Sequence, residues 1–214
     1  MTNVHVFSRR EEIVNALTHG IGALLSIAAL VILIVYSSMY GSAMHVVSFT
    51  VFGVSMFLLY IASTMAHALP HGKAKDIFEI LDHQAIYIFI AGTYTPITLI
   101  VLSGAIGWTL FAIVWTLAIG GVVFKTFFVK KYLFTSTILY VAMGWLIVIG
   151  WSGLVETMHS KGVLLLALGG ACYTLGAVFY VWRKFRYHHA IWHLFVIAGS
   201  TLHFFSVLFY VLPL

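Results

Sequence analysis

The chain has 214 residues, of which 62% are hydrophobic and only 8% are charged, whereas soluble domains carry about 25% charged residues. A water-soluble fold of this length cannot hide so much apolar surface, because a folded domain still exposes much of its surface. The composition therefore excludes a soluble domain and predicts that lipid surrounds most side chains. The formal net charge of +5 would suit either nucleic acid or anionic lipid, so the placement of the charges must decide.

Seven apolar segments follow one another along the chain, each long enough to cross a bilayer as a helix of about 20 residues. Hydrocarbon offers no partners to backbone groups, so segments of this length must be helical. The short connections leave no room for a separate soluble domain. The sequence predicts an all-α fold, one seven-helix transmembrane domain over residues 1–214, with spans near 17–38, 45–68, 81–102, 106–126, 134–153, 162–182 and 191–212.

The first apolar segment is predicted to be a retained span and not a cleaved signal peptide. Arg9 and Arg10 are followed at once by Glu11 and Glu12, and the apolar run exceeds the h-region of about 7–15 residues.

The single cysteine, Cys172, lies inside an apolar segment. No disulfide can form within the chain, and we interpret Cys172 as a small core residue.

Lysine and arginine are distributed very unequally between the two sides of the predicted bundle. Ten of them lie on one side, in the N-terminal segment, at the end of the fourth span and in the second, fourth and sixth connections, against Lys161 alone on the other side. Such an excess of basic residues marks the cytoplasmic side. We therefore expect a cytoplasmic N-terminus, an external C-terminus and a multi-pass protein of the cell membrane, and the basic charge needs no nucleic-acid partner. The ten are Arg9, Arg10, Lys73, Lys75, Lys125, Lys130, Lys131, Arg183, Lys184 and Arg186.

Polar and ionisable residues at membrane depth are costly and by default indicate function. Most of those in this chain fall near the predicted cytoplasmic face. His203 alone lies deeper, about 15 Å along the seventh helix from His193 at 1.5 Å per residue. The residues near that face are His19, Ser63, His67, Asp82, His83, His189 and His193.

His189 and His193 are four residues apart, so they share one face of a helix and can bind one metal ion. By itself this spacing fits a cationic cluster at the membrane surface equally well. His67, in the second span, strengthens the metal interpretation, although a histidine at a helix end can also reach the interface. Three histidines form a zinc site with an open fourth position, which suits activation of water.

Asp82 is the acidic residue best placed to assist such a site, because it is expected at the start of the third span. A carboxylate there would orient a water molecule or act as a general base. The alternative is a helix-capping aspartate. Farther along the same span, Gly92-Thr93-Tyr94-Thr95-Pro96 predicts a kink, and Tyr94 either packs there or lines a cavity beside the metal.

Taken together, these residues resemble the hemolysin III proteins, the bacterial branch of the progestin and adipoQ receptor superfamily. The resemblance covers nearly the whole chain. Its motifs are Glu11-Glu12 with Asn15 through His19-Gly20-Ile21-Gly22, Ser63-Thr64-Met65-Ala66-His67, Asp82-His83 leading to Gly92-Thr93-Tyr94-Thr95-Pro96, and His189-Ala190-Ile191-Trp192-His193.

The resemblance implies a Zn²⁺ ion held by His67, His189 and His193 near the cytoplasmic face. It further implies that Asp82 hydrogen-bonds the water on that zinc and that Ser63 lies near the metal. The eukaryotic relatives are implied to act as hormone receptors or as lipid-amide hydrolases of the ceramidase type. The bacterial members are linked with hemolysis and with membrane-lipid homeostasis. The loops here are too short for a hormone-binding domain.

Three functions are consistent with this pattern. The first is a zinc-dependent hydrolase that acts on amides or esters of membrane lipids, with Asp82 and Ser63 in catalytic roles. The second is a non-catalytic membrane sensor or regulator with a structural zinc. The third is a cytolytic pore. A pore through one chain needs polar residues through the full depth of the membrane, whereas here they gather at one end; a pore built from several chains is left open.

Overall fold

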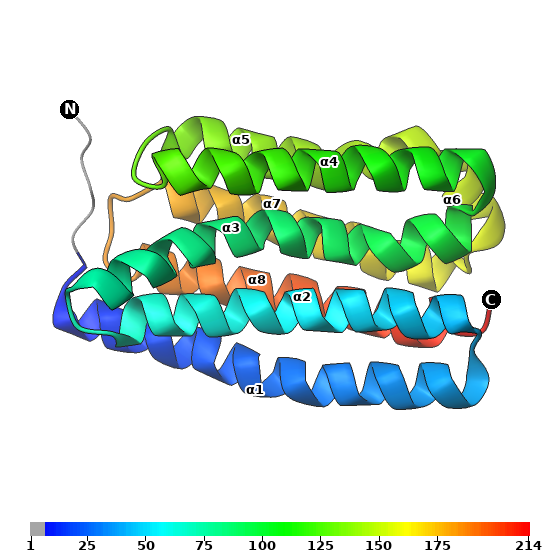
Figure 1. Cartoon of the computed structure of the whole chain (residues 1–214), viewed down its shortest axis with the longest axis horizontal. Helices are drawn as coiled ribbons and strands as arrows, with labels where there is room; N and C mark the ends of the chain where they lie inside the picture. The colour runs from blue at the N-terminus through cyan, green and yellow to red at the C-terminus, as the bar shows by residue number, and fades with distance from the viewer. Residues whose placement is uncertain (1–6) are drawn as a thin grey trace.

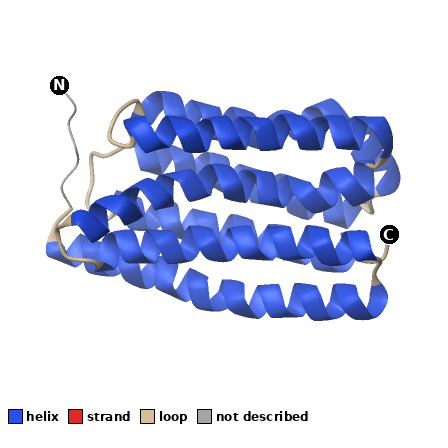
Figure 2. Ribbon diagram, in the orientation of Figure 1, coloured by secondary structure: helices blue, strands red, loops and turns tan. Residues whose placement is uncertain are grey.

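A computed structural model describes residues 7–214, and every regular element in that range is a helix (Figures 1 and 2). Seven helical segments are long and apolar enough to cross a membrane. The predicted all-α, seven-span architecture is confirmed. In chain order the elements are α1 (Arg9–Tyr40), α2 (Ala43–Ala68), α3 (Lys73–Pro96), η1 (Ile97–Leu102), α4 (Gly104–Phe128), α5 (Leu133–Gly144), η2 (Trp145–Gly150), α6 (Trp151–Thr157), α7 (Ser160–Val181), α8 (His188–Ser206) and η3 (Val207–Val211).

Neighbouring spans are antiparallel, and the packing follows chain order before closing on itself. Helix α1 packs on α2, α2 on α3 and α3 on α4, while α7 packs on α8 and α8 returns to α1. The N- and C-terminal ends lie at opposite ends of the bundle (Figure 1), as an odd number of spans requires. All ten basic residues named above therefore belong to the end that holds the N-terminus, which we call the N-end; Lys161 is at the C-end.

The outer surface of the bundle is apolar along its length. On α1, for example, Leu17, Leu24 and Val31 are each more than half exposed. A water-soluble monomer rarely shows such a continuous apolar surface. Lipid accounts for it, and the chain is a multi-pass membrane protein.

Helices α1 and α3 begin about two turns before the positions predicted from hydropathy. Ser8 and Glu11 form a capping box, in which the Ser8 backbone N–H donates to the Glu11 carboxylate over 2.9 Å; this starts α1 at Arg9. Gly72, with a φ of 153°, ends the preceding turn, and α3 starts at Lys73. Asp82 is consequently well inside α3, so its interpretation as a capping residue at the start of the span is wrong.

The third and fifth spans leave α-helical geometry without ending. Helix α3 runs through Pro96 and continues as the π-helix η1, while η2 is a 3₁₀ segment between α5 and α6. The Tyr94 hydroxyl joins the two spans: it donates to the Gly144 carbonyl over 2.7 Å and accepts from the Ile147 N–H over 2.8 Å. These bonds satisfy backbone groups that the irregular segment would otherwise leave unpaired in the membrane.

Candidate metal centre

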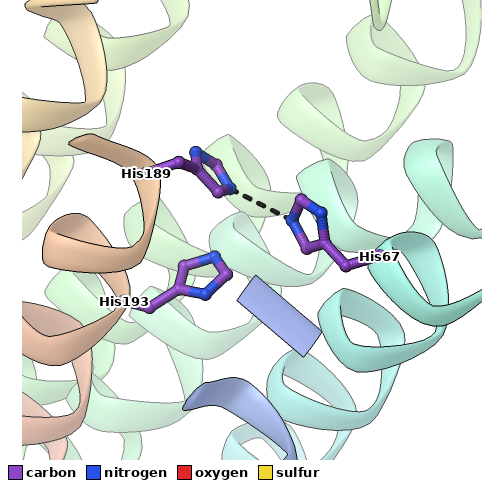
Figure 3. A group of neighbouring side chains, drawn as sticks. All are labelled: His67, His189 and His193. Atoms are coloured by element: carbon purple, nitrogen blue, oxygen red, sulfur yellow. Dashed lines mark hydrogen bonds between the residues drawn. The ribbon is translucent and has the colours of Figure 1, made fainter. Parts of the chain in front are cut away.

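Three histidines converge at the N-end of the bundle, one from the last turn of α2 and two from the start of α8 (Figure 3). One ring nitrogen of each of His67, His189 and His193 lies within 4.8 Å of the other two. The Nε2 atoms of His67 and His189 are 3.2 Å apart. The antiparallel packing therefore brings together the three side chains that the sequence singled out.

His67 is oriented by an acidic residue of α1. The Glu12 carboxylate lies 2.6 Å from His67 Nδ1 and also accepts from Lys75 Nζ over 2.9 Å. Lys75 donates in addition to the carbonyl of Ala66 over 2.6 Å. A carboxylate at Nδ1 holds the proton there and leaves the Nε2 lone pair for a metal, an arrangement common behind metal-binding histidines.

His193, on α8, is also oriented by α1, through residues one and two turns after Glu12. Its Nδ1 lies 3.2 Å from the Asn15 carbonyl, which only accepts, and 3.0 Å from Thr18 Oγ1. Nδ1 is therefore the protonated nitrogen and Nε2 is free to bind a metal. The ring of His19 stacks on that of His193, with centroids 3.4 Å apart and planes at 13°. Parallel stacking prevents both rings from pointing their lone pairs at one ion, so His19 positions His193 and is not a fourth ligand.

The donor set fits a zinc ion. Zinc–nitrogen bonds of about 2.0–2.1 Å in tetrahedral geometry place ligand nitrogens roughly 3.3 Å apart, and the His67–His189 separation of 3.2 Å already matches this spacing. Because His67 keeps its proton on Nδ1, a proton on His189 Nε2 or a cation must lie between the two nitrogens. A cation would satisfy all three convergent lone pairs at once.

Asp82 and Ser63 adjoin the histidine cluster from α3 and α2. The Asp82 carboxylate is an electrostatic neighbour of His67 and of the Ser63 hydroxyl. Ser63 is fully buried, and its hydroxyl lies within hydrogen-bonding reach of the Asp82 carboxylate. A buried hydroxyl and carboxylate side by side form a polar pair next to the histidines.

Two cavities meet at the cluster. The outer one, which we call the vestibule, has a volume of about 490 Å³ and is lined by charged residues of the N-end. The inner one, about 120 Å³, is lined mainly by apolar and aromatic side chains such as Phe89, Trp145 and Val196. Asp82 and His189 line both cavities, whereas His67 faces the vestibule and His193 the inner cavity. The cluster therefore lies between a polar space and an apolar one.

Comparisons with known proteins identify the family of the chain. Residues 7–204 match the family model described as Haemolysin-III related. The chain belongs to the haemolysin-III-related family. It is 57% identical to Hemolysin-3 of Bacillus cereus over 204 residues, covering 95% of this chain and 93% of that protein. It is 56% identical to the Hemolysin-3 homolog of Bacillus subtilis (strain 168) over 205 residues, covering 96% of each.

A more distant relative connects this haemolysin-III-related protein with animals. The human monocyte to macrophage differentiation factor, a member of the progestin and adipoQ receptor superfamily, is 29% identical over 165 residues, which cover 73% of this chain and 67% of that protein. The resemblance inferred from the motifs is thus confirmed at the level of family and superfamily.

Sequence reasoning missed the roles of the α1 residues that orient the cluster. Glu12 looked like a flanking charge, Asn15 was seen only as part of a motif, and His19 was predicted near the cytoplasmic face but was given no role. Their spacing carried a signal, since steps of three or four residues place all three on one helix face. Tyr94 lines the inner cavity, which His189 and His193 also line, so the expectation that it lines a cavity beside the cluster is confirmed. Within that cavity it is twelve residues, or about 18 Å, along α3 from Asp82.

Proposed function

We propose that this haemolysin-III-related protein is a zinc-dependent hydrolase of the cell membrane that cleaves an amide or ester bond of a membrane lipid and so contributes to membrane-lipid homeostasis. The observation that supports it most is the position of the histidine cluster between the polar vestibule and the apolar inner cavity. An amphiphilic lipid whose acyl chain enters the inner cavity has its polar linkage at the cluster and its head group in the vestibule.

His67, His189 and His193 would hold the zinc. When bound by three histidines, zinc leaves one position for water, lowers the pKa of that water to about 7 and polarises a carbonyl. The rest of the chemistry falls to the residues of the chain. The Asp82 carboxylate, which lines both cavities, would orient the attacking water and accept its proton. That proton would then pass to the departing amine or alcohol as the carboxylic acid forms.

Residues around the cluster would prepare the reaction. Glu12 and the Asn15 carbonyl hold the imidazoles of His67 and His193 in fixed orientations, so little reorganisation is needed during the reaction. The Ser63 hydroxyl, which lies beside the Asp82 carboxylate, would donate to the substrate carbonyl or to the water. The inner cavity would exclude bulk water from the acyl side of the bond.

The test is Asp82→Asn, which keeps the shape of the side chain and removes its charge. Loss of a general base typically costs about 10²–10⁴-fold in rate, so we expect near-full zinc occupancy with release of fatty acid reduced by that factor. Purified protein would be assayed against a panel of lipid amides and esters, with zinc measured on the same samples. Asp76→Asn is the matched control, because Asp76 also lines the vestibule but bonds Lys130 over 3.2 Å; it should retain activity.

Two outcomes would contradict the proposal in different ways. Wild-type protein with a full complement of zinc but no fatty acid released from any lipid of the panel would favour the sensor or regulator function. Loss of zinc in Asp82→Asn would make the aspartate a ligand, or an essential support of the ligands, and not a base.

A further inference from the structure

The vestibule is lined by four basic and four acidic side chains, and its internal ion pairs leave two of the basic ones without an acidic partner. Lys75 is paired with Glu12, and Lys130 with both Asp76 and Glu79 over 3.2 and 3.3 Å. The hydrogen bond to Asp76, with the one to Glu79, raises the pKa of Lys130 above its ordinary value. Lys130 is therefore protonated and already paired with two carboxylates.

Two lining cations stay outside those pairs. Neither Lys131, in the connection from α4 to α5, nor Arg183, just after α7, forms an ion pair with any of residues 7–214. The Nε of Arg183 is also buried and has no hydrogen-bond partner in that range. A shielded guanidinium nitrogen without a partner is costly. The remaining unpaired acid, Asp82, stands at the inner limit of the vestibule beside the histidines.

We infer that the vestibule binds a phosphate-bearing lipid head group and that Arg183 is its principal recognition residue, with Lys131 in support. The planar guanidinium offers paired N–H donors that match phosphate oxygens. The volume of about 490 Å³ falls within the usual range of ligand pockets, about 300–1,000 Å³. If the protein is the hydrolase proposed above, its substrate is then a phosphate-bearing lipid and not a neutral one. This statement about the substrate rests on the proposed function.

The location of these residues also favours a lipid over a free anion. The vestibule opens at the N-end, and its inner limit adjoins the apolar cavity through Asp82, His83, Tyr180 and His189, which line both spaces. A free phosphate would use the basic side chains and leave the apolar cavity empty. A lipid would use both with one molecule.

The experiment compares two probes that differ only in the phosphate: lauroyl glycerol phosphate and lauroyl glycerol. Affinities for purified protein in neutral detergent at fixed ionic strength would be measured by the quenching of tryptophan fluorescence. We expect the phosphate-bearing probe to bind at least about 10-fold more tightly to the wild type, the equivalent of about 1.4 kcal/mol. Arg183→Met should remove most of that preference, and Arg183→Lys should restore part of it. Lys184→Met, a neighbouring exposed position that does not line the vestibule, should keep it.

Metal and turnover are separated from head-group binding by repeating the measurement without zinc. The preference should persist in the His67→Ala, His193→Ala variant and, should that variant fold poorly, in chelator-treated wild type. A hydrolase assay that fails while this preference holds removes the proposed function and leaves the head-group site. Equal binding of both probes to the wild type, persistence of the full preference in Arg183→Met, or inorganic phosphate binding as tightly as the lipid would each overturn the inference.

Discussion

Histidines occur at both ends of the bundle, but the two ends use them differently. At the C-end, His45 accepts from the backbone N–H of Ser42 at the start of its own helix, over 3.2 Å, and His159 accepts from the backbone N–H of Lys161 over 3.2 Å. These imidazoles cap helices locally. At the N-end, His67, His189 and His193 approach one another from two helices and are oriented by a third.

The difference shows what distinguishes a candidate site from a structural histidine in a membrane protein. A capping histidine needs one local partner and has no reason to lie near another histidine. A ligand histidine needs its second nitrogen fixed by an outside group, and helix α1 supplies such groups to two of the three. Helix α1 contributes no ligand of its own, yet it determines which nitrogen of His67 and of His193 faces the centre.

The prediction with the largest expected effect concerns which end of the bundle faces the cytoplasm. The ten-to-one distribution of basic residues predicts that the N-end is cytoplasmic. With Cys172 replaced by Ala, single cysteines at Ser42 and at Lys131 would report the two sides. A membrane-impermeant maleimide should label Ser42→Cys in intact spheroplasts and Lys131→Cys only after lysis. The reverse pattern would place the proposed metal centre outside the cell.

The next prediction tests whether α1 orients the histidines for metal binding. Glu12→Ala should weaken zinc binding about 10–100-fold, the usual cost of losing a group that orients a ligand. Glu12→Gln should lose less, because its amide oxygen can still accept from His67 Nδ1. Zinc affinity would be measured by competition with a chromogenic chelator, and Glu156→Ala at the C-end is the matched control. Equal affinities for Glu12→Ala and wild type would show that the carboxylate does not hold His67 for the metal.

The smallest effect concerns packing near the C-end. Leu110 is 1% exposed, and in a soluble core Leu→Ala costs about 2–5 kcal/mol. Lipid tails are as apolar as leucine, so the transfer part of that cost largely disappears. We expect Leu110→Ala to lower the free energy of unfolding by at most about 2 kcal/mol. Unfolding in mixed micelles with a denaturing detergent would measure it, and a changed zinc affinity would contradict the separation of the two ends.

Hydropathy and spacing predict the spans and the histidine cluster, and they fail where the cause is not local. The seven segments and the histidine cluster follow from apolar length and from which helix ends share a side of the membrane. The start of α3 at Lys73 was missed because the first two turns of this helix carry charged residues, and a hydropathy pattern detects only the apolar part of a helix. The role of Glu12 was missed because it depends on the rotation of α1 against α2, which only packing determines.

The most direct test of the account is the metal itself. Purified wild-type protein should contain one zinc per chain, and X-ray absorption at the zinc edge should show three imidazole nitrogens at about 2.0–2.1 Å. The His67→Ala, His193→Ala variant should contain none, while a His45→Ala, His159→Ala variant at the C-end should contain as much as the wild type. A correctly folded wild-type protein without zinc, or one whose zinc survives the loss of His67 and His193, would contradict the central claim.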